Sequence, residues 1–354
     1  MLAEVCLGFV VLGLVAYAVL GGADFGAGFW DLTAGGAERG GRVRGMIQRS
    51  MAPVWEANHV WLIFVLVVAW TAFPVVFASM FSTLSIPLFL AGMGIIFRGA
   101  AFALRGQAAT IREARVLGAL FALSSVLIPF FLGAVLGGVA SGRVAVGNSA
   151  GDAVESWLNP TSAVVGAIAV ATGAHISAVY LAGDSARAGL PDLVDAFRRR
   201  AIASGVVAGA LALGGLVVVR SDARDLFDGL TGGGGLAMVI VSGVAGLLTL
   251  LLVRGGRFGL ARVTVALAVA AIAVGWVFAQ DPYVLPPELT LEQAAASDAT
   301  LTALVIGVGV GFVLLVPALA LLYRLTLTGR LDQQFEPLDQ RFRPLTADDH
   351  PEQP

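Results

Sequence analysis

The chain has 354 residues, of which 58% are hydrophobic and 13% charged, and it is therefore far more apolar than an ordinary soluble domain. Its formal net charge of −2 gives no reason to expect a nucleic-acid partner, and three histidines and one cysteine leave few ligands for a metal. This composition predicts a protein that lies within a lipid bilayer.

The sequence contains about nine apolar stretches, each close to the roughly 20 residues that a helix needs to cross the hydrocarbon core. We therefore expect an all-α polytopic membrane protein, with a single transmembrane domain over residues 1–330 and a polar cytoplasmic tail over residues 331–354. Nine spans would form two four-helix bundles plus one peripheral helix. The expected spans are Val5–Gly22, Pro53–Phe73, Val76–Phe97, Val116–Ala140, Thr161–Gly183, Ala201–Val219, Gly233–Val253, Phe258–Ala279 and Leu301–Leu327.

Arginines gather in alternate connections, those that follow the first, third, fifth, seventh and ninth spans. The connections on the opposite side contain only Arg143, Arg220 and Arg224. Because basic residues near span ends collect on the cytoplasmic side, the N-terminus is expected outside and the C-terminus in the cytoplasm. The connection 280–300 then lies outside, and its prolines favour an extended segment.

Ionisable residues inside a span cost about 2.5–3.5 kcal/mol each on insertion scales, so each one needs a partner or a function. Glu56 and His59 are three residues apart near the start of the second span, on one helical face, and Asn58 is beside them. Asp24 and Arg98 are expected at a similar level, at the cytoplasmic ends of the first and third spans. Two interpretations remain open: a proton-conducting or ion-pairing cluster in which Arg98 tunes the carboxylates, or helix-end charges that reach water and pin helices together.

A histidine in the fifth span, His175, lies roughly 12 Å from the cytoplasmic side, close to the expected level of His59. Two imidazoles at one depth could ligate a haem between helices, although a hydrogen-bonded interior histidine is the more common case. The tryptophans Trp55, Trp61 and Trp70 are expected to serve as packing or interfacial anchors.

Two segments of the chain resemble signature segments of subunit II of cytochrome bd quinol oxidases. The first is Asp24-Phe25-Gly26, and the second extends from Pro53 to Leu62 and matches at Trp55, Glu56, Asn58, Val60, Trp61 and Leu62. A third segment, Arg98-Gly-Ala-Ala-Phe102 with Arg105, is also similar. It lacks the acid that the family usually has before this arginine, because Ala103 and Leu104 occupy the positions.

The resemblance implies a haem-free subunit of the two-bundle fold, which stabilises a partner subunit I that holds haem b, haem d and the quinol site. Such a complex lies in the bacterial inner membrane, oxidises quinol and reduces dioxygen to water. Small accessory subunits could join it, and a quinone or a lipid could fill the cavity of subunit II.

The same resemblance assigns roles to residues by position. Glu56 becomes a candidate for a cytoplasmic proton path, together with Asp24. The implied supporting residues are Asn58, His59, Arg98 and Arg105, and the implied structural residues are Trp55, Trp61, Phe25 and Gly26.

Two other functions remain as alternatives. A secondary transporter would place its substrate at broken helices near the midplane, and Pro87, Pro129 and Pro317 could interrupt spans in this way. A purely structural membrane partner would differ from the oxidase subunit only in whether Glu56 exchanges protons during turnover.

Overall fold

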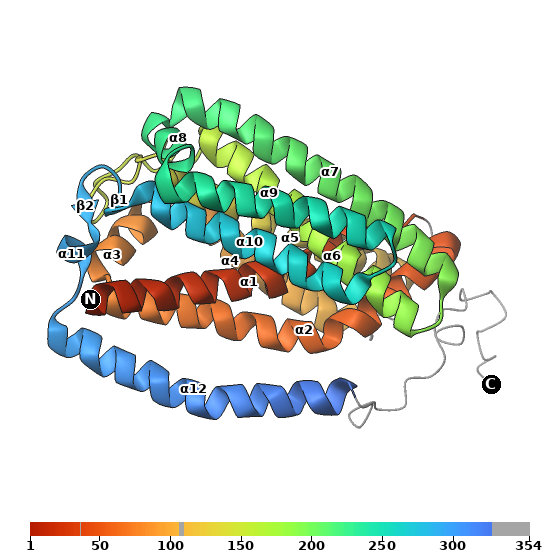
Figure 1. The fold of residues 1–354 in the computed structure, drawn as a ribbon. Helices are drawn as coiled ribbons and strands as arrows, with labels where there is room; N and C mark the ends of the chain where they lie inside the picture. Colours follow the sequence, from red (N-terminus) through yellow and green to blue (C-terminus); the bar gives the residue numbers. More distant parts are fainter. Residues whose placement is uncertain (36, 106–109, 328–354) are drawn as a thin grey trace.

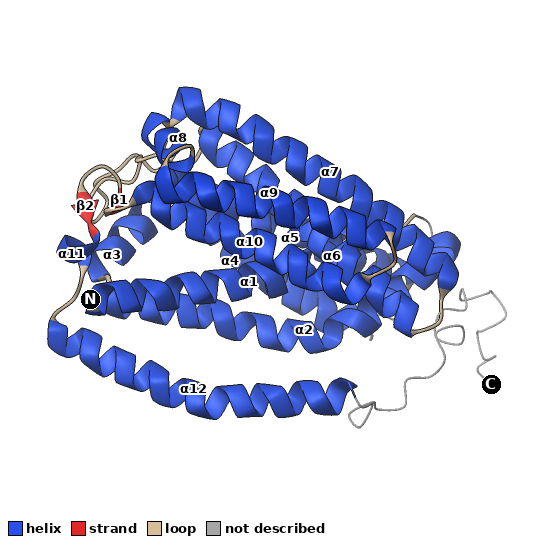
Figure 2. Cartoon of the chain, in the orientation of Figure 1, coloured by secondary structure: helices blue, strands red, loops and turns tan. Residues whose placement is uncertain are grey.

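The computed structural model describes the backbone of residues 1–35, 37–105 and 110–327. It describes the side chains of these residues except 37–39, 51–57, 105, 111, 319, 322–323 and 326–327. This part of the chain is helical apart from its connections and one small two-stranded hairpin (Figure 2). The expected all-α polytopic class is confirmed, whereas the tail 331–354 lies outside the described residues.

Within the described residues, eight helices are long and apolar enough to cross a membrane, and a bent pair of helices makes a ninth candidate. The bent pair is α2 (Ala37–Ala72) and α3 (Pro74–Thr83). The eight are α1 (Leu2–Leu32), α4 (Ser85–Arg105), α5 (Ile111–Ala140), α6 (Pro160–Arg187), α7 (Pro191–Asp222), α9 (Gly233–Arg254), α10 (Phe258–Gln280) and α12 (Asp298–Leu327).

The long helices form two groups that lie side by side and one helix that stands apart (Figure 1). In the first group α1 packs against α2 and α5, and α5 packs against α4. In the second, α6 packs against α7 and α10, and α9 packs against α7 and α10. The groups meet where α6 contacts α1 and α5. Helix α12 contacts mainly α1 and α2, at the edge of the first group. This arrangement matches two four-helix bundles with a peripheral helix.

The third span begins later than expected, because the chain turns sharply at Phe73. This residue has non-helical backbone angles, φ −133° and ψ 61°, and Pro74 starts the short helix α3 at an angle of 118° to α2. Proline cannot supply the amide hydrogen that a continuous helix needs, which explains the break. The predicted span Val76–Phe97 is therefore wrong at its start: α3 is separate, and the membrane helix is α4.

The first two spans belong to helices longer than their apolar stretches. Helix α1 continues to Leu32, ten residues past the predicted end at Gly22, and α2 begins at Ala37, sixteen residues before the predicted start at Pro53. Asp24 and Glu56 therefore lie in the interior of long helices and not at the helix ends. At about 1.5 Å per residue, α1 extends roughly 12 Å beyond Asp24.

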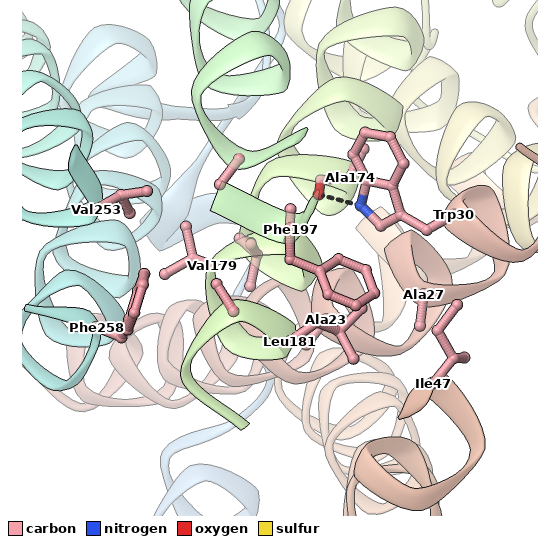
Figure 3. Close-up of a cluster of buried hydrophobic side chains, with 14 of the residues drawn as sticks. Ala23, Ala27, Trp30, Ile47, Ala174, Val179, Leu181, Phe197, Val253 and Phe258 are labelled. Carbon is pink, nitrogen blue, oxygen red and sulfur yellow. Dashed lines mark hydrogen bonds between the residues drawn. The ribbon is translucent and has the colours of Figure 1, made fainter. Parts of the chain in front are cut away.

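The largest group of buried apolar side chains lies where the two helix groups meet (Figure 3). It joins Ala23, Ala27 and Trp30 of α1 to Leu181 of α6 and Phe197 of α7. The Trp30 ring is oriented by its indole nitrogen, which donates a 2.8 Å hydrogen bond to the Ala174 carbonyl oxygen. Small residues on α1 and α6 allow these helices to approach closely, as is common between helices in lipid.

Short elements cover the helix ends at the end of the molecule where α1 begins (Figure 1). The strands β1 (Tyr283–Leu285) and β2 (Leu289–Thr290) form an antiparallel pair, followed by α11 (Leu291–Ala294), while α8 (Arg224–Leu230) links α7 to α9. The connection 141–159 is tied to α3, because the amides of Gly147 and Ser149 donate to the hydroxyls of Ser79 and Ser82. The extended segment expected after Gln280 is thus a small hairpin.

Candidate functional site

The central polar feature of the first helix group is an ion pair between Asp24 of α1 and Arg98 of α4. Arg98 Nη1 donates to Asp24 Oδ2 at 2.8 Å, and Nη2 donates to Oδ1 at 2.7 Å. Nη2 also donates to the Asp24 backbone carbonyl at 3.1 Å. Only 1% of Asp24 and 2% of Arg98 is exposed. Because both charges are buried, removing either partner would leave an uncompensated charge in the helix interior.

Helix α5 completes the surroundings of the Arg98 guanidinium. Arg98 Nε donates a 2.8 Å hydrogen bond to the hydroxyl of Ser125, which in turn donates to the Phe121 carbonyl oxygen at 2.6 Å. The guanidinium carbon also lies 4.6 Å from the centre of the Phe121 ring and 5.2 Å from that of Phe25. Hydrogen bonds to a carboxylate and a hydroxyl, with aromatic faces on the remaining sides, fix the cation in one position.

Glycines bring the neighbouring helices close enough to build this site. A Cβ atom at Gly26 would lie 2.0 Å from the Gly173 carbonyl oxygen of α6, and one at Gly28 would lie 2.1 Å from the Ser125 hydroxyl. Gly26 therefore allows α1 to contact α6, and Gly28 makes room for the side chain that supports Arg98. The glycine of the first signature segment, Gly26, is thus explained by helix packing.

Asn58 of α2 faces α1 one turn before Asp24. Its side chain is fully buried, and a Cβ at Gly21 would lie 2.9 Å from its Oδ1 atom. Neither Oδ1 nor Nδ2 of Asn58 has a hydrogen-bond partner among the described residues. A buried amide without partners costs about 1–3 kcal/mol of stability, so Asn58 destabilises the apolar interface between α1 and α2.

The other sequence-predicted residues of α2 lie partly outside the described structure. The backbone of Trp55 and Glu56 is helical, but their side chains, like that of Arg105 on α4, lie outside the described residues. His59 is half-buried. Trp61 points toward α12, because its ring centre lies 6.4 Å from that of Phe312 on α12, and it lies 5.9 Å from that of Phe64 on α2 itself. Helix α2 therefore presents Asn58 to α1 and Trp61 to α12.

An apolar cavity of about 510 Å³ lies between α2 and α12. Its walls include Trp61, Phe64 and Val68 of α2 and Leu304, Val308 and Phe312 of α12. No charged side chain lines it among the described residues. It is separate from the Asp24–Arg98 pair, which is enclosed by α1, α4 and α5.

His175 of α6 is directed at α7. Its Nδ1 atom forms a 2.9 Å hydrogen bond with the carbonyl oxygen of Ala201, and the ring packs against Gly205, both on α7. This is the position of a hydrogen-bonded interior histidine, and the structure gives no support to a haem held jointly by His59 and His175. Among the described residues, no three His, Cys, Asp or Glu side chains gather as a metal site.

Sequence reasoning missed the contribution of α5. Ser125 holds the Arg98 Nε atom, and Gly28 accommodates Ser125. The only signal was the polar pair Ser124-Ser125 within the otherwise apolar fourth span, and a serine in a helix usually satisfies its own hydroxyl through a backbone carbonyl.

Comparison with known proteins places this arrangement in a wider group. A solved structure of bd oxidase from Geobacillus thermodenitrificans is similar, with a TM-score of 0.70 and 26% identity over 92% of this chain and 99% of that chain. A putative cytochrome bd menaquinol oxidase subunit II from Bacillus subtilis is 25% identical over 88% of this chain and 90% of its own length. A cytochrome bd ubiquinol oxidase subunit 2 from the same organism is 32% identical, over 35% of this chain and 36% of its own length.

The family model described as cytochrome bd terminal oxidase subunit II matches residues 2–326, which includes all of the described helices and nearly all of their residues. The match therefore covers Asp24, Arg98 and the whole second signature segment. The chain belongs to the cytochrome bd terminal oxidase subunit II family.

Proposed function

We propose that this chain is the haem-free second subunit of a quinol-oxidising, dioxygen-reducing complex in the bacterial inner membrane. Haem b and haem d would be held by a partner subunit I, and small accessory subunits could join the two. The observation that carries the proposal is the match of the family model along residues 2–326, together with the 0.70 TM-score to a bd oxidase structure. The eight or nine candidate spans among the described residues support the membrane location.

The transporter alternative is not favoured. Pro129 and Pro317 lie inside the continuous helices α5 and α12, and Pro87 lies in the first turn of α4, where proline is tolerated. Among the described residues, the one bent pair is α2 and α3, which bends at Phe73, at the end of α2. No described helix is therefore broken at the level where a transporter would bind its substrate.

Within the complex, we assign Asp24 and Glu56 different tasks in a proton path from the cytoplasm. Asp24 is bound through both oxygens by Arg98, so its carboxylate is held in place beside the path as the partner of that guanidinium. Glu56 is the candidate proton carrier. Asn58, two residues later, supports a hydrated route because its buried amide atoms need partners that water can supply.

The cavity between α2 and α12 suits an apolar occupant. Its volume of about 510 Å³ and its aliphatic and aromatic walls fit a lipid chain or the tail of a quinone. The N-terminus would be outside and the residue 331–354 tail in the cytoplasm, as the arginine distribution indicates. The missing acid of the third segment has little consequence in this scheme, because Ala103 and Leu104, which occupy its positions, are both exposed.

The proposal is tested with Glu56→Gln in the purified complex. Glutamine retains the shape and hydrogen bonding of the side chain but cannot titrate, so quinol-driven oxygen consumption should fall by about 10²-fold, the usual contribution of a positioned acid–base group. The haem absorption spectrum should be unchanged, and Glu56→Asp should retain part of the rate. Wild-type turnover by Glu56→Gln would instead assign the chain a purely structural role.

A further inference from the structure

A cluster of arginines lies where α1 and α6 end and α7 begins. We call this region, formed by the last turns of α1 and α6 and the first three turns of α7, the arginine-rich end. Most of its acids have an arginine partner. The pairs are Asp31 with Arg44, Asp184 with Arg187 and Arg262, Asp192 with Arg42, and Asp195 with Arg198.

Arg200 lies in the same region but has no acidic partner among the described residues. It is half-buried, yet it forms no ion pair and donates no hydrogen bond to any described residue. Its Nη1 atom is buried without a partner. Arg199, next to it in sequence, is exposed and adds a second positive charge that repels the first. The two arginines therefore form a local excess of positive charge that the described residues do not neutralise.

Two aromatic rings hold the Arg200 guanidinium in place. Its central carbon lies 5.4 Å from the centre of the Trp30 ring and 5.2 Å from that of Phe197. Figure 3 shows these two rings in the buried cluster, with Trp30 anchored to the Ala174 carbonyl oxygen. A cation stacked on rigid rings has a defined direction for its remaining N–H groups, which is the geometry that binds an oxyanion through two parallel hydrogen bonds.

The position of Arg200 along α7 identifies the source of the anion. The apolar stretch that crosses the membrane begins at Ala201, the next residue, and Trp30 lies at the same level. Arginines at the start of an apolar span lie at the depth of the lipid headgroups, where phosphodiester groups are concentrated. We propose that Arg200, with Arg199 beside it, binds the phosphodiester of an anionic phospholipid at the arginine-rich end.

The test uses the full-length chain purified with the subunits that accompany it and stripped of lipid in detergent. The thermal midpoint is followed while phosphatidylglycerol, phosphatidylcholine or inorganic phosphate is added. Phosphatidylglycerol should raise the midpoint of the wild type, and the rise should fall to less than half in Arg200→Gln. Arg257→Gln is the matched control, because Arg257 is an exposed arginine in the turn between α9 and α10 at this end of the molecule, and it should retain the full rise.

Each alternative gives a different result. An equal rise with phosphatidylcholine, or with Arg200→Gln, would overturn the proposal. A full rise with inorganic phosphate alone would assign the site to a free anion. Loss of the accompanying subunit from Arg200→Gln, without any lipid effect in the wild type, would assign Arg200 to a carboxylate of that subunit. If Arg200→Gln does not fold, Arg200→Lys is used instead. Lysine retains the charge but cannot form the bidentate hydrogen bonds, so the rise in its thermal midpoint should be intermediate.

Discussion

Arg98 donates hydrogen bonds to both carboxylate oxygens of Asp24 across the α1–α4 interface, with Nη···Oδ distances of 2.8 and 2.7 Å. We predict that Asp24→Asn destabilises the chain by about 3–5 kcal/mol, because it leaves a buried guanidinium without its counter-charge. The measurement is the thermal midpoint and the yield of the purified complex. Asp192→Asn is the control, since its pair with Arg42 is exposed and contributes about 0–1 kcal/mol. Similar losses in the two variants would contradict a special role for the buried pair.

A second prediction concerns the close contact between α1 and α6. Gly26→Ala should lower the thermal midpoint strongly, because the new methyl group would lie 2.0 Å from the Gly173 carbonyl oxygen and push backbone from backbone. Gly8→Ala is a matched control on the same helix, since a Cβ there meets nothing within 4 Å. The explanation of the signature glycine by packing fails if the two variants have the same midpoint.

The number of spans and the level of Asp24 and Arg98 were predictable because both depend on local properties, apolar length and the distance of a charge from a span end. The ends of α1 and α2 were not, because hydropathy locates the lipid boundary, whereas a helix continues past it until its backbone is capped or broken. The bend at Phe73 was hidden for a related reason. Pro74 lies between two apolar runs, and a proline can begin a new helix or end an old one.

The third prediction concerns cofactor content. The chain separated from its partner should contain no stoichiometric haem in a pyridine haemochrome assay, because the ring of His175 is hydrogen-bonded to the Ala201 carbonyl and packed against Gly205. One haem per chain that disappears in His175→Ala would show that this histidine is a ligand, and it would contradict the proposal of a haem-free subunit.

The fourth prediction fixes the orientation in the membrane. In a chain whose buried cysteine is removed by Cys6→Ala, a cysteine at Glu292 should react with an impermeant maleimide added outside intact cells. A cysteine at Arg257, in the exposed turn between α9 and α10, should react only after the cells are opened. The opposite pattern would place Glu56 on an outward path and remove the cytoplasmic source of protons.

The continuity of α1 past Asp24 restricts how the length of this chain can vary in evolution. One residue inserted into a helix rotates everything beyond it by about 100°. An insertion between Gly21 and Asp24 would therefore turn the carboxylate away from Arg98 or the glycine away from Asn58. Length changes are tolerable in the connection 141–159 and around the hairpin, where no helical face must be kept. Related chains should accordingly differ in length at that end of the molecule and keep one invariant spacing from Gly21 to Gly28.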